Sequence, residues 1–454
     1  MRFFGSSLGD PPGGNPRRFA ACIIGLLSLV AWPSLWTCSA AEPVNPAAWA
    51  KTNLPQLVEL YKFLHEHPEL SLKEKETSAR MAKELQDAGV KVTPNVGGFG
   101  VVGVLENGPG KTVLLRSDMD ALPVAEQTGL PYASKVRTED ARGAVVGVMH
   151  ACGHDLHMAN LIGVARYLAS NRDAWSGTLL FVFQPAEEVG AGADGMIRDG
   201  LFARFPRPDF AVALHDSADL PTGEIDYLAG FALANVDSVD IVIKGRGGHG
   251  ASPDSTIDPI VIAAKLVLDL QTIVSREMKP IEPAVVTVGS IHAGTKHNVI
   301  SDECRLQITL RSLTPEVRKK LQDAVRRKAL AAAASAGAPE PTVSISEGTP
   351  ALFNDPQLTQ RLAAVLKKHF GDDNVREGEP VMGGEDFGRF GSTGVPICML
   401  RLGAVNQKRL DEFAAKHVPP TSLHSPLYYP DAEESLVVGV PALVDCVTEL
   451  LPKN

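Results

Sequence analysis

Three apolar, strand-like runs of this sequence end in acidic residues or a histidine, and this pattern constrains the fold more than any other feature. The runs are residues 112–116, 177–183 and 210–214, and a helix-like stretch, 161–168, lies between the first two. Strands that alternate with helices are typical of an α/β protein with an open, largely parallel sheet. The carboxyl ends of parallel strands meet at one edge of such a sheet, where these proteins place their sites.

The residues that follow the three runs are of kinds that bind metals or protons. They are Asp118, Asp120, Glu187, Glu188, His215 and Asp216. Each is weak evidence alone, since a single histidine is usually a core residue and an acidic pair is usually solvated. Buried carboxylates without a counter-charge are too costly to be explained by packing. Because three strands bring such residues to one edge of the sheet, the sequence predicts a functional site there.

The densest group of potential ligands lies in residues 150–155. Cys152 and His154 flank Gly153, which allows a turn that points both side chains at one place. Thiolate and imidazole are the preferred ligands of zinc-like ions. The alternative is a helix N-terminus capped by Asp155, with incidental histidines.

Residues 233–346 show a separate pattern of predicted strands and helices. Their pattern predicts strand, helix, strand, strand, helix and strand, which is the ferredoxin-like βαββαβ arrangement. The predicted elements are residues 238–244, 257–274, 284–292, 304–313, 316–334 and 342–346. We therefore expect a compact domain inserted into a discontinuous α/β domain made of residues 42–232 and 347–454.

Residues 1–41 have the order of an export signal. Charged residues precede an apolar run, 19–36, and Ser39, Ala40 and Ala41 follow it. We predict an exported protein, periplasmic or secreted, and a retained membrane anchor is the alternative because the run is nearly long enough to span a bilayer. The net charge of −9 without a long basic tract argues against nucleic acid as a partner.

Eight short motifs follow one another along nearly all of the chain after this leader. They are His-Pro-Glu-Leu at 67–70, Arg-Ser-Asp-Met-Asp-Ala-Leu-Pro at 116–123, the cluster at 150–155, Gln-Pro-Ala-Glu-Glu at 184–188, Gly-Gly-His at 247–249, Asn-Val-Ile at 298–300, Gly-Glu-Asp-Phe at 384–387 and Leu-His-Ser at 423–425. In this order they resemble the M20 metallopeptidases, specifically the branch of aminoacylases, hippurate hydrolases and auxin-conjugate hydrolases.

The resemblance implies a metal-dependent amidohydrolase that holds two divalent ions, zinc or manganese, with cobalt or nickel as alternatives. The metal ligands that it implies are Cys152, which would bridge the ions, His154, Glu188, His215 and His424. Glu187 would be the general base that takes a proton from the attacking water, and Asp120 would orient the site. The role of Asp118 stays open, because other branches carry a ligand histidine there.

The resemblance also implies that the inserted domain is a lid and the contact of a homodimer. His249 and Asn298 would reach the substrate from this domain, His249 would stabilise the oxyanion, and Glu385 would contact the substrate. The implied substrates are N-acyl amino acids or related small conjugates. Alternatives are short peptides, cleaved by a carboxypeptidase or dipeptidase, and an inactive binding protein of the same fold. The stretch 138–146 looks longer than usual, so substrate detail cannot be transferred.

Two other enzyme classes fit part of the pattern. Zinc deaminases also use histidine, cysteine and a glutamate base, but their Cys-x-x-Cys motif does not occur in this sequence. A hydrolase with Cys152 as nucleophile would be inactivated by alkylation and not by chelation.

Overall fold

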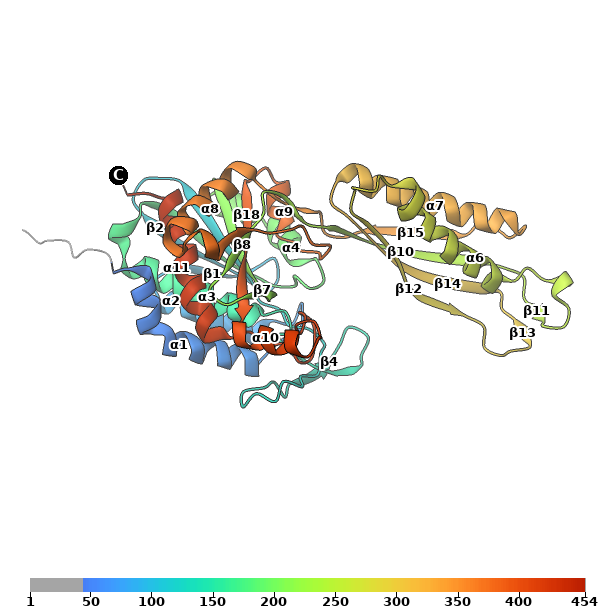
Figure 1. Cartoon of the computed structure of the whole chain (residues 1–454), viewed down its shortest axis with the longest axis horizontal. Coiled ribbons are helices and arrows are strands. Elements are labelled where there is room, and N and C mark those ends of the chain that lie inside the picture. The colour runs from blue at the N-terminus through green and yellow to red at the C-terminus, as the bar shows by residue number, and fades with distance from the viewer. Residues whose placement is uncertain (1–43, 454) are drawn as a thin grey trace, which may run out of the picture. The chain divides into compact units, whose positions relative to one another are not determined.

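The computed structural model describes residues 44–453 (Figure 1). The leader predicted for residues 1–41 lies outside the described residues, so export stays a prediction. Within residues 44–453, no helix combines the length and the apolar character that crossing a membrane requires.

An eight-stranded sheet forms the centre of the larger domain, in the order β1-β2-β6-β3-β7-β18-β8-β17. The central pairs β6–β3, β3–β7 and β7–β18 are parallel, and β1 and β2 continue the sheet antiparallel at one edge. This confirms the predicted largely parallel α/β sheet. The strands are β1 Lys91–Val96, β2 Gly100–Asn107, β3 Thr112–Asp118, β6 Gly177–Gln184, β7 Phe210–Pro221, β8 Ile225–Tyr227, β17 Val375–Glu377 and β18 Ile397–Val405.

Helices cover both faces of this sheet, which explains why its central strands are continuous apolar runs. In β3, Val113 and Leu115 face one core, whereas Leu114 between them faces the other. The first core contains α1 Pro46–Glu66, α2 Lys75–Asp87, α3 His154–Ser170, α8 Pro356–Phe370 and α11 Ala432–Leu450. The second contains α4 Gly192–Arg198, α5 Leu201–Arg204 and α9 Gly388–Ser392.

A separate four-stranded antiparallel sheet, in the order β12-β14-β10-β15, confirms the inserted ferredoxin-like fold. Figure 1 shows α6 and α7 side by side over one face of it, where they share a core with the strands. The elements are β10 Asn235–Lys244, α6 Pro259–Thr272, β12 Ala284–Ala293, β14 Glu303–Ser312, α7 Pro315–Ser335 and β15 Thr342–Glu347. A short extra pair joins β11 Gly248–His249 to β13 Val299–Ile300.

Some elements were missed because they bury little apolar surface. The helix α10 Gln407–Ala415 has no buried residue, and the edge strand β1 is mostly exposed. The stretch 138–146, predicted only to be long, forms a small hairpin between β4 Arg137–Glu139 and β5 Val145–Gly147. A further missed pair is β9 Gly230–Leu233 with β16 Leu352–Asn354.

Candidate metal centre

The carboxyl ends of β3 and β6, the middle of β7 and the start of α3 meet at one edge of the larger sheet. Most of the side chains there are buried, although each comes from a different part of the chain. The predicted residues at this place are Asp118 and His215 on the strands, Asp120, Glu187 and Glu188 just after strands, Cys152 just before α3 and His154 at its start.

One detail of the sequence interpretation is wrong, namely that a strand ends just before His215. β7 continues to Pro221, because β18 pairs with it in parallel through this region and aligns Arg401 with His215. His215 therefore projects from inside a strand, and its position is fixed by the ladder on that side.

The five predicted ligands form one continuous cluster. Cys152 Sγ lies 3.2 Å from His424 Nε2 and 3.7 Å from His215 Nε2. Glu188 Oε1 lies 3.5 Å from His424 Nε2 and 4.0 Å from His154 Nε2. Thiol, imidazole and carboxylate groups at such separations can converge on metal ions.

Two buried atoms of this cluster have no hydrogen-bond partner among the described residues, namely His154 Nε2 and Glu188 Oε1. Buried polar atoms are nearly always paired, because leaving one unpaired costs free energy. Both atoms are lone-pair donors toward the same space, so the donor set fits a divalent cation.

Backbone carbonyls orient the imidazoles of the cluster. His154 Nδ1 lies 2.8 Å from the carbonyl oxygen of Asp120, and His215 Nδ1 lies 2.7 Å from that of Asp216. Each Nδ1–H can donate to its carbonyl, which leaves the Nε2 lone pair toward the cluster. Metal-ligating histidines in proteins are commonly held in this way.

Asp120 holds the backbone that carries the glutamate pair. Its carboxylate accepts the N–H groups of Glu187 and Glu188, each at 3.0 Å, and the hydroxyl of Ser71 at 2.6 Å. Burial alone would raise the pKa of Asp120, but the contact with His154 and these donors keep it below its usual value. The structure thus places Asp120 as a support for the glutamate turn.

The buried guanidinium of Arg116 neutralises an acidic layer beside Glu187. It donates to Asp118 Oδ2 at 2.6 Å, to Glu385 Oε1 at 2.8 Å and to Asp386 Oδ1 at 3.1 Å. Glu385, expected to contact the substrate, is thus bound to Arg116 and only 2% exposed. Burial raises the pKa of Glu187 well above its usual value, and the carboxylates of Glu385 and Asp386 raise it further.

His157 is a site residue to which sequence reasoning gave no role. Its Nδ1 lies 2.7 Å from Asp118 Oδ1, and the backbone N–H of Asp216 donates to its Nε2 at 2.8 Å. It lies three residues after His154 on α3, so both rings share one helix face. That spacing could have indicated its place in the cluster.

His249 and Asn298 lie together, but in the inserted domain. His249 pairs with Val299 in the short β11–β13 ladder, and the N–H of Gly250 donates to the carbonyl of Asn298 at 2.9 Å. Both residues are exposed. No hydrogen bond or ion pair within residues 44–453 joins either side chain to the ligand cluster.

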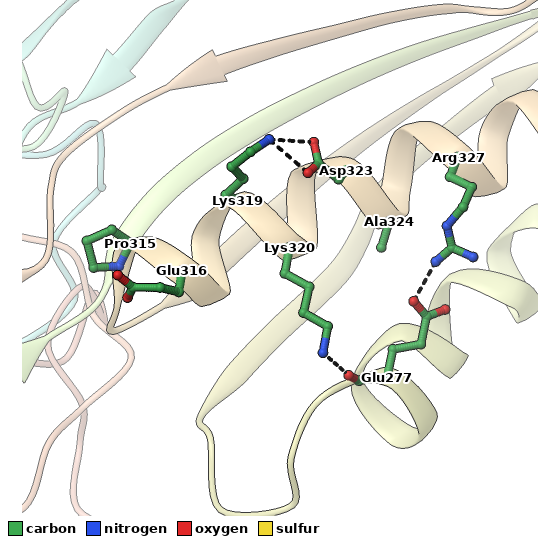
Figure 2. Close-up of a pocket in the computed structure, with 8 residues that line it drawn as sticks. All are labelled: Glu277, Pro315, Glu316, Lys319, Lys320, Asp323, Ala324 and Arg327. Atoms are coloured by element: carbon green, nitrogen blue, oxygen red, sulfur yellow. Dashed lines mark hydrogen bonds and ion pairs between the residues drawn. The ribbon is translucent and has the colours of Figure 1, made fainter.

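A surface hollow of about 710 Å³ lies on the inserted domain along α7 and the short helix Ile273–Glu277, and contains no cluster residue (Figure 2). The lysine and arginine side chains that line this hollow already have partners within the domain. Lys319 pairs with Asp323 at 2.8 Å, and Arg327 and Lys320 both bond to Glu277. The site is therefore recognised by its ligand chemistry and not by its volume.

The sequence profile of peptidase family M20/M25/M40 matches residues 114–425. The chain belongs to the M20 family. Thermostable carboxypeptidase 1 of Saccharolobus solfataricus is 39% identical over 357 residues, which are 78% of this chain and 87% of that protein. The N-acetyl-L-cysteine deacetylase of Bacillus subtilis is 38% identical over 351 residues, 76% of this chain and 79% of that protein.

Among solved structures, the YXEP protein of Bacillus subtilis is described as a dinuclear metal-binding peptidase from the M20 family. It superposes with a TM-score of 0.72 and 30% identity, and the match covers 88% of this chain and 99% of that one. The chain is thus a metal-dependent M20 hydrolase, which confirms the predicted enzyme class, family and fold.

A buried ionic cluster around His65 lies behind the metal centre of this M20 hydrolase. His65 Nδ1 lies 2.7 Å from Asp155 Oδ2, and its Nε2 lies 3.1 Å from Glu126 Oε1. Burial alone would lower the pKa of His65, but the hydrogen bonds to both carboxylates raise it to about 10. His65 thus links α1, the start of α3 and the loop that carries Glu126.

The substitution His65→Gln should make the free energy of unfolding less dependent on pH between about 6.5 and 10. Because the folded chain retains a proton that the unfolded chain releases in this range, stability falls as pH rises, by up to about 1.4 kcal/mol per pH unit. Urea unfolding of both proteins at several pH values measures the difference. The matched control is His67→Gln, an exposed histidine at the end of the same helix. Identical slopes for wild type and His65→Gln would contradict the prediction.

Proposed function

We propose that this M20 hydrolase cleaves the amide bond of N-acyl amino acids or related small conjugates. The observation that carries the proposal is the buried Glu187, which lies beside the cluster of thiol, imidazole and carboxylate ligands. The N-acetyl-L-cysteine deacetylase supports this substrate class. The carboxypeptidase relative supports the second candidate, hydrolysis of short peptides, which breaks the same kind of bond.

The proposed holders of the two divalent ions are Cys152, His154, Glu188, His215 and His424. When bound, such ions lower the pKa of a water molecule and polarise the carbonyl of the scissile amide. Zinc and manganese are the expected ions, and cobalt or nickel are alternatives. The dinuclear centre of the YXEP protein supports the count of two.

Glu187 is the proposed general base. One of its carboxylate oxygens lies within 4.8 Å of ligand atoms of His154 and Glu188, so it faces the centre. It accepts a proton from the attacking water and later donates that proton to the nitrogen of the leaving amine. Burial and the neighbouring carboxylates raise its pKa, which helps it to hold the proton between these two transfers. His249 and Asn298 are proposed to contact the substrate when the inserted domain closes as a lid.

The substitution Glu187→Gln should reduce hydrolysis of acetyl-methionine and hippurate at least about 10³-fold, because the amide cannot accept the proton. It should leave the metal content, measured by atomic emission, at the wild-type level. In parallel, a chelator should inactivate the wild-type protein, and zinc or manganese should restore it. Turnover that survives in Glu187→Gln, or loss of its metal, would refute the assigned role. Alkylation that inactivates an enzyme indifferent to chelation would favour Cys152 as nucleophile.

Arg311, which the sequence analysis did not single out, is a proposed contact for the carboxylate of the substrate. It lies on β14, is half-buried, and forms no ion pair within residues 44–453. Burial without such a partner lowers its pKa. A Cβ built on Gly384 would lie 3.2 Å from Arg311 Nη1, so the guanidinium reaches the segment that continues into Glu385. A cation at this place can bind the carboxylate that every N-acyl amino acid carries.

The substitution Arg311→Ala should raise the KM for acetyl-methionine about tenfold to a hundredfold and change kcat less, because it removes a contact to a part of the substrate that does not react. The acetyl-methionine methylamide lacks the carboxylate, so wild type and variant should hydrolyse it equally poorly. Arg305→Ala, an exposed arginine on the same strand, is the matched control. A KM that stays at the wild-type value would exclude this contact.

We also propose a homodimer formed through the inserted domain. β12 is an edge strand of ten residues whose outer side pairs with no strand among the described residues. Exposed apolar side chains lie on it and on α6, namely Ile291 at 48%, Val261 at 55% and Leu268 at 72% exposure. Unpaired edges and exposed apolar patches favour association.

Sedimentation equilibrium of the wild-type protein should give twice the mass of one chain. The double substitution Val261→Glu and Leu268→Glu should shift this mass to that of one chain, because it places charges in the buried contact. Substitution of two exposed residues on α7, Lys319→Glu and Asp323→Lys, should leave the dimer intact. A wild-type protein of single-chain mass would contradict the proposal.

A further inference from the structure

A second buried carboxylate, Glu74, holds the turn that carries the glutamate pair. Glu74 lies just before α2 and is fully buried. Its Oε1 accepts the backbone N–H of Ala186 at 2.7 Å and that of Leu72 at 3.0 Å. No step proposed above uses this residue.

Both residues that bond to Glu74 Oε1 have a backbone conformation that disfavours a side chain. Ala186 has φ +53° and Leu72 has φ +66°, in the left-handed region where only glycine is free of strain. Such conformations persist only where the surroundings impose them. Glu74 therefore supplies part of the free energy that keeps two strained turns in place.

The turn at Ala186 leads directly into the catalytic pair. Three consecutive N–H groups, those of Ala186, Glu187 and Glu188, are all accepted by side-chain carboxylates, the first by Glu74 and the other two by Asp120. The two carboxylates are also connected through the chain, because Ser71, next to Leu72, donates to Asp120.

We propose that Glu74 is a positioning residue, which fixes the left-handed turn at Ala186 and thereby points Glu187 at the substrate and Glu188 at the metal. The proposal rests on the function proposed for this glutamate pair. Without Glu74 we expect residues 185–188 to populate other conformations, in which both glutamates are misplaced.

Glutamine can replace Glu74 in this role, because the contact requires an acceptor and not a charge. Glu74 Oε2 is buried and has no partner among the described residues. Burial, together with the nearby Asp120, raises the pKa of Glu74 to about 7. The amide of glutamine keeps the oxygen that receives both N–H groups.

The experiment compares Glu74→Ala with Glu74→Gln and with Glu74→Ala combined with Ala186→Gly, each fully loaded with metal. In Glu74→Ala we expect kcat to fall about a hundredfold with KM nearly unchanged, because the Glu187 carboxylate is displaced from the position that proton transfer requires. Glu74→Gln should stay within about threefold of wild type, because the acceptor remains. Adding Ala186→Gly should recover about tenfold of the loss, because glycine adopts a positive φ without the penalty of a side chain.

A second measurement does not depend on catalysis. In the cobalt-loaded protein, the visible absorption reports the geometry of the ligands. Glu74→Ala should change this spectrum, and Ala186→Gly in the same background should move it back toward wild type. Glu84→Ala is the matched control, because Glu84 is a buried acid of α2, the helix that follows Glu74, and bonds to Arg80 and Arg166. It should lower stability and leave kcat and the spectrum unchanged.

A Glu74→Ala variant with wild-type kcat, or one that Ala186→Gly does not improve, would overturn the proposal. If Glu74→Ala does not fold, the result for Glu74→Gln decides, because loss of activity there would mean that the charge and not the acceptor matters. Failure of the proposed function would be seen separately, as turnover by Glu187→Gln. The cobalt spectrum reports the position of Glu188 whichever amide is cleaved.

Discussion

The ion pairs of Arg116 are the interaction on which the rest of this centre depends. Arg116 lies on the central strand β3 and is 3% exposed, and it bonds to Asp118, Glu385 and Asp386. Burying that many carboxylates without a cation would cost several kcal/mol for each charge. Asp118 belongs to the part of the larger domain before the inserted domain, whereas Glu385 and Asp386 belong to the part after it. The guanidinium thus joins the two halves of the larger domain at the place where the chemistry is proposed.

Hydrogen bonds from uncharged donors of the first half also hold Asp386, which belongs to the second half. Gln184, at the end of β6, donates to Asp386 Oδ1 at 2.6 Å, and the N–H of Ala193 in α4 donates to Asp386 Oδ2 at 2.9 Å. The acidic residues of this layer are therefore fixed by partners on several elements. A layer held in this way can present Glu187 with a constant electrostatic environment, which a flexible loop could not do.

The sequence predicted those elements that bury a regular apolar face, and it missed elements and contacts that do not. All six elements predicted for the inserted domain were found, because each has a periodic apolar face toward one core. By contrast, α10 buries no residue and gives no periodic signal. The ligand cluster was identified through the resemblance, since His215 or His424 alone is uninformative. The contact of Glu74 with Ala186 joins residues 112 positions apart in the sequence, and no local pattern predicts such a pairing.

The environment of each carboxylate decides which of them can act as the base. The Asp120 carboxylate accepts hydrogen bonds from Ser71, Glu187 and Glu188 and lies beside the His154 ring, so its charged form is favoured and its affinity for a proton is low. Glu187 is buried beside other carboxylates, so its charged form is disfavoured. A group that must take up a proton and pass it on needs the second environment. Asp120 and Glu187 carry the same functional group in adjacent segments, and the donors around Asp120 together with the acids around Glu187 fit support for the one and the proposed proton transfer for the other.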